Sequence, residues 1–158
     1  MFIFATNKLH INQKLNRMND VISKEVFFKL SIDSVWNAIT KAEEISTWFI
    51  KADFKAEVGY HYTFNSDGED CSAILGEVKS ANPYTLIYTW VVQDNPVETT
   101  VKWELKTVAG GTQLYLEHSG IAGYSSETAL SMFNSFNGGW ENCVKELTSH
   151  LTTLAHAG

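Results

Sequence analysis

The chain has 158 residues, of which 44% are hydrophobic, and a formal net charge of −6 at pH 7. One domain of this length buries roughly 70% of the surface of its unfolded chain, and the apolar content excludes a disordered or collagen-like chain. The acidic balance argues against nucleic-acid binding, because phosphates require a concentrated basic surface. Five Trp, six Tyr and nine Phe residues are more than a plain core of this size needs.

We expect an N-terminal extension over residues 1–20 and a single domain over residues 21–158. Residues 1–17 hold three bases and no acid, which leaves a formal charge of −9 on the rest of the chain. The apolar run over residues 1–5 is too short for a signal sequence or a membrane span. No later stretch approaches 18 uninterrupted apolar residues. The sequence therefore predicts no membrane span.

Only two cysteines are present, Cys71 and Cys143, and they lie far apart in the sequence. They lack the spacing of a metal site, and isolated cysteines are typical of small buried side chains. We therefore predict a cytoplasmic protein.

Residues 21–32 alternate apolar and polar side chains, which predicts a strand. Asp33 or Ser34 can cap a short helix over residues 35–40. A second short helix is expected over residues 41–47, directly after the first. Such a sequence predicts a bent helical pair after the first strand.

From residue 49 the apolar period becomes two and remains so for about seventy residues, which predicts antiparallel strands joined by short turns. Gly110 and Gly111 predict a tight hairpin, because glycine tolerates the positive φ of two-residue loops. The strands that we delimit cover residues 59–65, 71–81, 84–92, 97–108 and 112–120.

The last segment, residues 126–155, has apolar side chains at helical spacing, and Ser125 or Ser126 can cap it. Gly138 and Gly139 each cost about 1 kcal/mol in a helix interior, so close packing, a kink or space beside Trp140 must compensate. We favour a bend that follows the sheet. The predicted architecture is α+β: a curved antiparallel sheet of about seven strands wrapped on a long C-terminal helix.

This element order and several sequence motifs resemble the START-like, Bet v 1-like superfamily with the helix-grip fold. The nearest branch is the family named after the activator of Hsp90 ATPase. The motifs are SVWNAIT, EISTWF, GYHYTF, LIYTW, VKWEL, GGTQLYLEHSG and GGWENCVKELTSHL, within residues 21–155. In SIDSVW the chain departs from the Ala-Pro that the family more often has before VW. The resemblance implies a hydrophobic cavity between sheet and helix, which holds lipids or polyketides in relatives, and implies no shared catalytic set.

The aromatic residues are the candidates for lining such a cavity, because pockets for apolar ligands have aromatic and aliphatic walls with a few polar groups. The alternative interpretation is that they only fill the core. The predicted ligand-binding residues are Trp48, Tyr62, Phe64, Tyr88, Trp90, Trp103, His118, Phe133, Phe136 and Trp140.

Catalytic motifs are absent from the sequence: it has no GxSxG, HExxH, P-loop or GxGxxG pattern. We assign no catalytic residue, metal or cofactor, and keep Glu77 and His118 as weak catalytic candidates. Glu77 enters the cavity if Cys71 and Leu75 face inward, and is solvated if the alternate residues do. For His118 we favour a hydrogen bond to a loop carbonyl over an acid–base role.

The favoured function is the binding of a small hydrophobic molecule, lipid or polyketide-like, without catalysis. The alternatives are a START-like enzyme (cyclase, dehydratase or hydrolase) that uses His and Glu as acid–base groups, and a stress- or chaperone-associated interaction protein. A fold-level analogy does not decide between these classes. A homodimer is compatible with the sequence.

Overall fold

The computed structural model describes residues 20–65 and 72–157. Within them, seven antiparallel strands form one sheet in the order β1-β7-β6-β5-β4-β3-β2. The strands are β1 (Val21–Phe28), β2 (Lys51–Asp53), β3 (His61–Asn65), β4 (Ile74–Ser80), β5 (Thr85–Val92), β6 (Asn95–Val108) and β7 (Gly111–Ser119). The helices are α2 (Ile32–Thr40), α3 (Ala42–Trp48), the 3₁₀ turn η1 (Ile121–Gly123) and α4 (Ser126–Ala157). The predicted extension, residues 1–19, lies outside the described residues.

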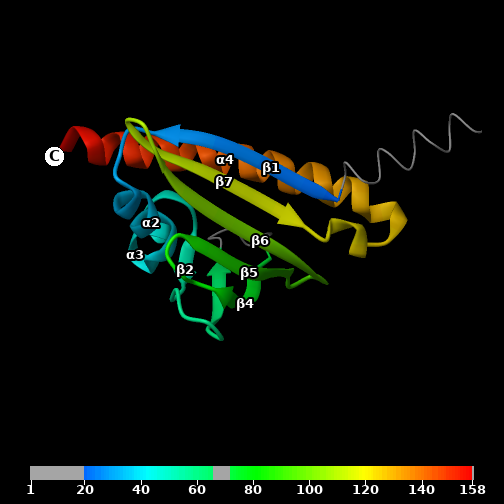
Figure 1. The fold of residues 1–158 in the computed structure, drawn as a ribbon. Coiled ribbons are helices and arrows are strands. Elements are labelled where there is room, and N and C mark those ends of the chain that lie inside the picture. Colours follow the sequence, from blue (N-terminus) through cyan, green and yellow to red (C-terminus); the bar gives the residue numbers. More distant parts are fainter. Residues whose placement is uncertain (1–19, 66–71, 158) are drawn as a thin grey trace, which may run out of the picture.

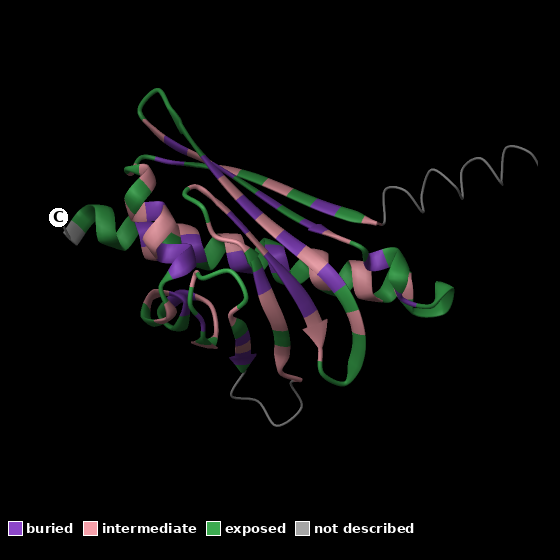
Figure 2. Cartoon of the chain, turned by 60° about the horizontal axis from the view of Figure 1, so that its bottom comes forward, coloured by how far each residue is buried: buried purple, intermediate pink, exposed green. Residues whose placement is uncertain are grey.

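The sheet curves around α4, which runs along its inner side, and α2 and α3 lie at the C-terminal end of α4 (Figure 1). Buried residues gather where the strands face this helix (Figure 2). Lys24 of β1 fixes α4 to one edge of the sheet, because its Nζ donates to Asn137 Oδ1 at 2.7 Å and lies 3.2 Å from Glu141 Oε1. The predicted α+β architecture is confirmed. None of the described helices is long and apolar enough to cross a membrane.

The first strand ends earlier than its apolar alternation predicts, at Phe28. Ser31 caps α2 instead of Asp33 or Ser34: its Oγ accepts the backbone N–H of Ser34 at 3.3 Å. Asp33 occupies the first turn, where a carboxylate interacts favourably with the helix dipole. The predicted cap was wrong because Ile32, which continues the strand pattern, is the first residue of the helix.

The predicted hairpin between the last two strands is confirmed. Val108 pairs with Gly111, so the loop is Ala109–Gly110, and Gly110 has a φ of 84°. Gly111 belongs to β7, where a side chain would clash with the carbonyl oxygen of Phe28. The three-residue strand β2, by contrast, is too short for its alternation to be recognised in the sequence.

Gly76 of β4 lies beneath the ring of Tyr62, its partner on β3. A Cβ at this position would clash with that ring and with the carbonyl oxygen of Thr89. We expect Gly76→Ala to lower the free energy of unfolding by about 1–3 kcal/mol, as overpacked cores do. The measurement is urea unfolding, with Gly138→Ala as the control, because a Cβ at Gly138 meets no atom within 4 Å. The control should gain about 1 kcal/mol of helix propensity. Equal effects of the two substitutions would contradict this explanation.

Candidate functional site

The centre of the sheet–helix interface is packed with side chains. Aromatic rings contact one another there: the centroids of Tyr62 and Phe64, both on β3, are 4.7 Å apart, and those of Tyr62 and Tyr88 of β5 are 5.0 Å apart. Seven of the predicted ligand-binding residues are at most 6% exposed: Trp48, Tyr62, Phe64, Tyr88, Trp103, His118 and Trp140. Packed aromatic rings therefore occupy the space beneath the middle of α4, where the family resemblance predicted a cavity.

The core phenols are hydrogen-bonded inside the protein. The Tyr62 hydroxyl donates to the carbonyl oxygen of Thr89, and the Tyr88 hydroxyl accepts the indole N–H of Trp103 at 2.9 Å. Burial raises the pKa of both tyrosines well above the usual range. Both phenols therefore stay protonated at neutral pH and serve packing.

A groove remains beside this core, between α4 and strands β4 and β5. It has a volume of about 410 Å³ and is partly open to solvent. The linker between α3 and β2 contributes two of its lining residues. The residues that line the groove are Phe49, Ile50, Ser72, Ile74, Trp90, Val92, Met132, Ser135, Phe136, Gly139 and Trp140.

Four aromatic rings supply most of the groove wall. The centroids of Trp90 and Trp140 are 5.2 Å apart, and Phe136 lies edge-on to Trp90 at 6.3 Å. Phe49 stacks near-parallel to Trp140 at 6.1 Å. Among the described residues, the lining contains two serine hydroxyls and no charged side chain. The groove is suited to apolar molecules with flat faces.

Gly139 explains part of the space in this groove. A Cβ built on Gly139 or on its neighbour Gly138 meets no atom within 4 Å, and Gly139 is the one of the pair that lines the groove. Of the three compensations considered for this glycine pair, open space beside Trp140 is the one that the contacts support. The helix runs without interruption through both residues.

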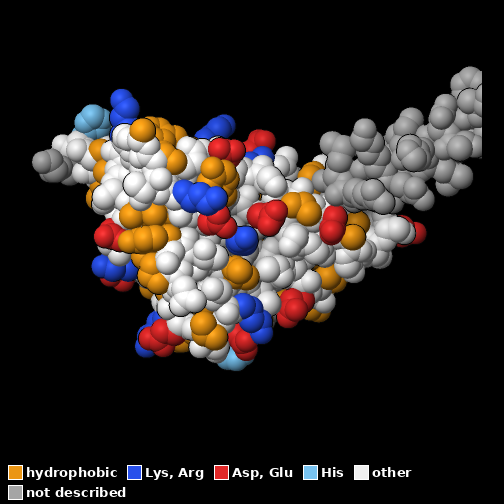
Figure 3. Space-filling model, in the orientation of Figure 1, with side chains coloured by type: hydrophobic (Ala, Val, Ile, Leu, Met, Phe, Trp, Pro, Cys, Tyr) orange, Lys and Arg blue, Asp and Glu red, His pale blue; other side chains and the backbone are white. Residues whose placement is uncertain are grey.

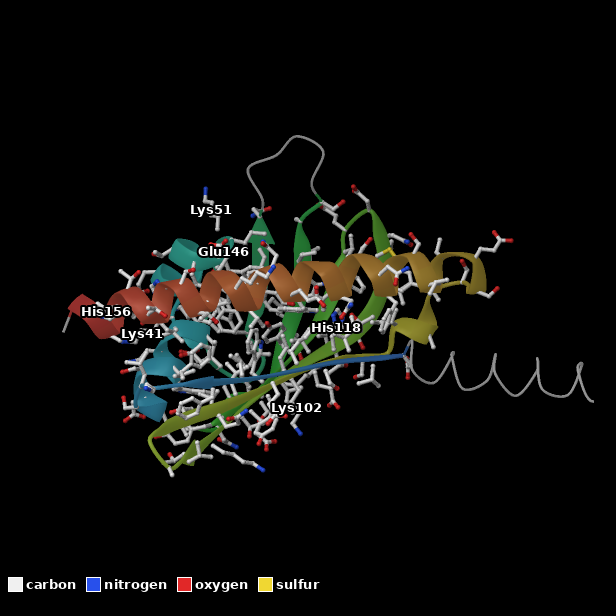
Figure 4. All side chains as sticks on the ribbon, turned by 90° about the horizontal axis from the view of Figure 1, so that it is seen from above. Lys41, Lys51, Lys102, His118, Glu146 and His156 are labelled. Atoms are coloured by element: carbon white, nitrogen blue, oxygen red, sulfur yellow. The ribbon has the colours of Figure 1, made fainter. Side chains whose placement is uncertain are left out.

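His118 is fully buried beneath α4 and has a defined protonation state (Figure 4). The indole N–H of Trp140 can only donate, and it lies 2.9 Å from His118 Nδ1. Nδ1 is therefore the acceptor, and Nε2 carries the hydrogen that it donates to Thr99 Oγ1 at 2.7 Å. Thr99 in turn donates to the carbonyl oxygen of Trp90 at 3.0 Å.

Burial lowers the pKa of His118 to about 4, so the ring is neutral at physiological pH. Both nitrogens are occupied by protein groups, which leaves neither for a substrate proton. The expected hydrogen bond to a loop carbonyl is replaced by the contacts with Thr99 and Trp140. His118 holds Trp140, a wall of the groove, in one orientation.

Trp90 has an unused donor. Its indole nitrogen is buried and finds no acceptor within residues 20–65 and 72–157. Buried polar groups are nearly always paired, so a donor of this kind at the base of a groove is unusual.

Glu77 lies on the outer face of the sheet. Ile74 lines the groove, and Gly76 and Val78 face inward, which is the arrangement that leaves Glu77 in solvent. Its carboxylate pairs with Lys79 Nζ at 2.5 Å and lies 3.5 Å from His61 Nε2.

The hydrogen bond from Lys79 is the main cause that lowers the pKa of Glu77. Glu77 and His118 therefore lie on opposite faces of the sheet. The proposed acid–base pair is not assembled.

The other hollows of the described surface have a different character. One, on the outer face of β1, β7 and β6, is lined by acidic and basic residues such as Glu25, Lys102, Glu104 and Glu117. Charges of both signs are interspersed over this side of the molecule (Figure 3). Within the described residues, no group of three His, Cys, Asp or Glu side chains is arranged to hold a metal ion. Cys143 is buried and has no disulfide partner within the described residues, and burial raises the pKa of its thiol. Cys71 lies outside the described residues.

Comparison with known families assigns the chain. The model of the family described as "Activator of Hsp90 ATPase homolog 1-like protein" matches residues 29–152, most of the domain. The chain belongs to this family. The resemblance inferred from the sequence motifs is thereby confirmed. No curated protein matches the chain.

Solved structures agree with the assignment and confirm the helix-grip fold. A Mesorhizobium loti protein is 26% identical with a TM-score of 0.74, and the match covers 84% of this chain and 97% of that one. A Bacillus halodurans protein is 28% identical with a TM-score of 0.66, covering 83% and 96%. CalU16 from Micromonospora echinospora is 27% identical with a TM-score of 0.62, covering 81% and 71%.

The structure divides the predicted ligand-binding residues of this family member into three groups. Trp90, Phe136 and Trp140 line the groove, Phe133 is half-buried outside its lining, and the other six lie in the core. Phe49 and Ile50 were not predicted from the sequence, because they belong to an irregular linker without a regular apolar period. Gly139 was not predicted either, although its cost in a helix was a usable signal of space.

Proposed function

We propose that the protein binds a small apolar molecule in the groove between α4 and strands β4 and β5. The observation that carries this proposal is the uncharged wall of four aromatic rings around a space of about 410 Å³. This volume falls within the roughly 300–1,000 Å³ typical of ligand pockets. The superfamily resemblance supports the same interpretation, because relatives hold apolar ligands between sheet and helix.

The groove differs from the single apolar side chains that are scattered over most protein surfaces. Its aromatic side chains, Phe49, Trp90, Phe136 and Trp140, converge on one concave space from three separate parts of the chain. Contiguous apolar surface of this kind is typical of interaction sites. Neutral His118 supports the wall from behind by fixing the indole of Trp140.

Binding is preferred to catalysis because the candidate acid–base groups do not reach the groove. Glu77 is on the outer face, and both nitrogens of His118 are engaged. The buried phenols of Tyr62 and Tyr88 are likewise hydrogen-bonded within the core. None of the four lines the groove.

The test is to fill the groove from Gly139. We expect Gly139→Leu to weaken binding of the uncharged dye N-phenyl-1-naphthylamine at least about tenfold, a loss of about 1.4 kcal/mol. Gly138→Leu is the matched control, because it adds the same side chain to the same helix outside the groove. Dye fluorescence gives the affinities, and native mass spectrometry of protein purified from cells shows any ligand that it retains. No dye binding by the wild type, or equal binding by both variants, would contradict the proposed function.

A further inference from the structure

We propose that the ligand is an uncharged, planar aromatic molecule and not an ionised fatty acid. This inference rests on the proposed function, since it concerns the same groove. Two independent properties of the lining carry it: the absence of a cation among the described groove residues and the flat aromatic rings that line the groove.

The first property concerns charge. Moving a carboxylate or sulfonate from water into an apolar site is costly unless a cation or several donors compensate. The described lining offers two hydroxyls and the single indole N–H of Trp90, and the hydroxyl of Ser72 already donates to the carboxylate of Asp94. An anionic ligand at this end would approach the like charge of Asp94.

Lys51, the lysine nearest in sequence to a lining residue, does not supply a cation to the groove. Lys51 follows the lining residue Ile50, but its exposed side chain points away from the body of the protein (Figure 4). A neutral molecule avoids the desolvation penalty altogether, so the groove selects against ionised ligands.

The second property concerns shape. Trp140 and Phe136 of α4 contact Trp90 of β5, with centroids 5.2 and 6.3 Å apart, so the rings form one continuous aromatic surface along the groove. Phe49 and Trp140 lie within 28° of parallel, whereas Trp90 and Phe136 are nearly perpendicular, at 85°. A flat ring system can therefore stack on the face of one ring and meet the edge of its neighbour.

Rigidity favours the same ligand class. An acyl chain loses the freedom of many rotatable bonds when it is bound, whereas a fused ring system has little to lose. The hydrogen bond from Trp140 to buried His118 keeps the indole wall from rotating to follow a flexible chain. A rigid wall gives its best contact to a rigid, flat partner.

The test of charge uses two dyes that share the anilinonaphthalene rings. N-Phenyl-1-naphthylamine is uncharged, and 8-anilinonaphthalene-1-sulfonate adds one sulfonate. We expect the uncharged dye to bind the wild type at least about tenfold more tightly.

A cation placed in the groove should reverse this preference. Ser135→Lys adds an ammonium group to the lining, and we expect it to raise the affinity for the sulfonate dye at least about tenfold while changing that for the neutral dye little. Ser131→Lys adds the same charge one helical turn earlier, outside the lining, and should leave both affinities near the wild-type values.

The test of shape is displacement of N-phenyl-1-naphthylamine by two uncharged competitors, anthraquinone and dodecan-1-ol. Anthraquinone should displace half of the dye at a concentration at least about tenfold lower than dodecan-1-ol requires.

Equal affinities of the wild type for the two dyes, or no response to Ser135→Lys, would overturn the assignment of charge. Equal competition would overturn the assignment of shape. In both cases the Gly139→Leu effect on the neutral dye would persist. Loss of that effect would instead overturn the proposed function.

Discussion

Replacing His118 with Gln is expected to remove a pH-dependent loss of stability of about 3 kcal/mol. The wild-type ring is neutral, buried and hydrogen-bonded at both nitrogens, and burial lowers its pKa from 6.5 to about 4. Each unit of pKa shift corresponds to about 1.36 kcal/mol of stability. A proton on Nδ1 would also face the indole N–H of Trp140, donor against donor.

The sign of the effect follows from linkage. Above pH 6.5 the ring is neutral in both the folded and the unfolded state, so its full contribution is present. As the pH falls from 6.5 towards 4, the unfolded chain binds a proton that the folded protein excludes, and the free energy of unfolding decreases. Gln does not titrate, and its amide can accept from Trp140 and donate to Thr99.

Urea unfolding at several pH values from about 7.5 to 4 measures this difference. Carboxylates titrate in both proteins, so the wild-type-minus-variant difference isolates His118. His61→Gln is the matched control, because the His61 side chain is 81% exposed, and its pH profile should follow the wild type. A wild-type-minus-His118→Gln difference that does not vary with pH would rule out the assigned protonation state.

Strand phase is the property that the sequence predicts best. In β5 the alternation points Leu86, Tyr88 and Trp90 to one face, and all three are buried in the structure. A period of two assigns faces reliably wherever one face is covered. The same logic left Glu77 undecided, because polar and apolar residues occur in both phases of β4.

A glycine shows which residues of β4 face inward. Gly76 pairs with Tyr62, whose ring occupies the space above it, so Gly76 must face inward and Glu77 outward. Its significance appears only once the register between β3 and β4 is known. Local periodicity contains no information on that register.

The position of the groove could not be predicted from the sequence for a related reason. Phase predicts that Tyr62, Trp90 and Trp103 face inward, but it does not say which rings pack together and which border a space. That depends on how far α4 lies from each strand and on the linker that carries Phe49 and Ile50. Interior packing density leaves few voids, so the location of one is decided by tertiary contacts.

Trp140→Ala should be among the most damaging substitutions in the chain, with an expected cost of about 3–5 kcal/mol. The Trp140 ring packs against Trp90, Trp103 and Phe49, and its exposed fraction is 3%. Removal of the indole creates a void in the core and leaves Nδ1 of His118 without its donor. Urea unfolding gives the cost, and the loss of the groove wall should also abolish the binding of N-phenyl-1-naphthylamine.

Indole itself separates the void from a general loss of structure. Free indole should stabilise Trp140→Ala more than the wild type, by about 1.4 kcal/mol when its concentration is ten times its Kd for the void. Trp36→Ala is the control, because Trp36 is half-buried on α2, against Tyr84, away from the groove. That variant should lose less stability and gain nothing specific from indole. If indole stabilised all three proteins equally, Trp140 would not be the common wall of core and groove.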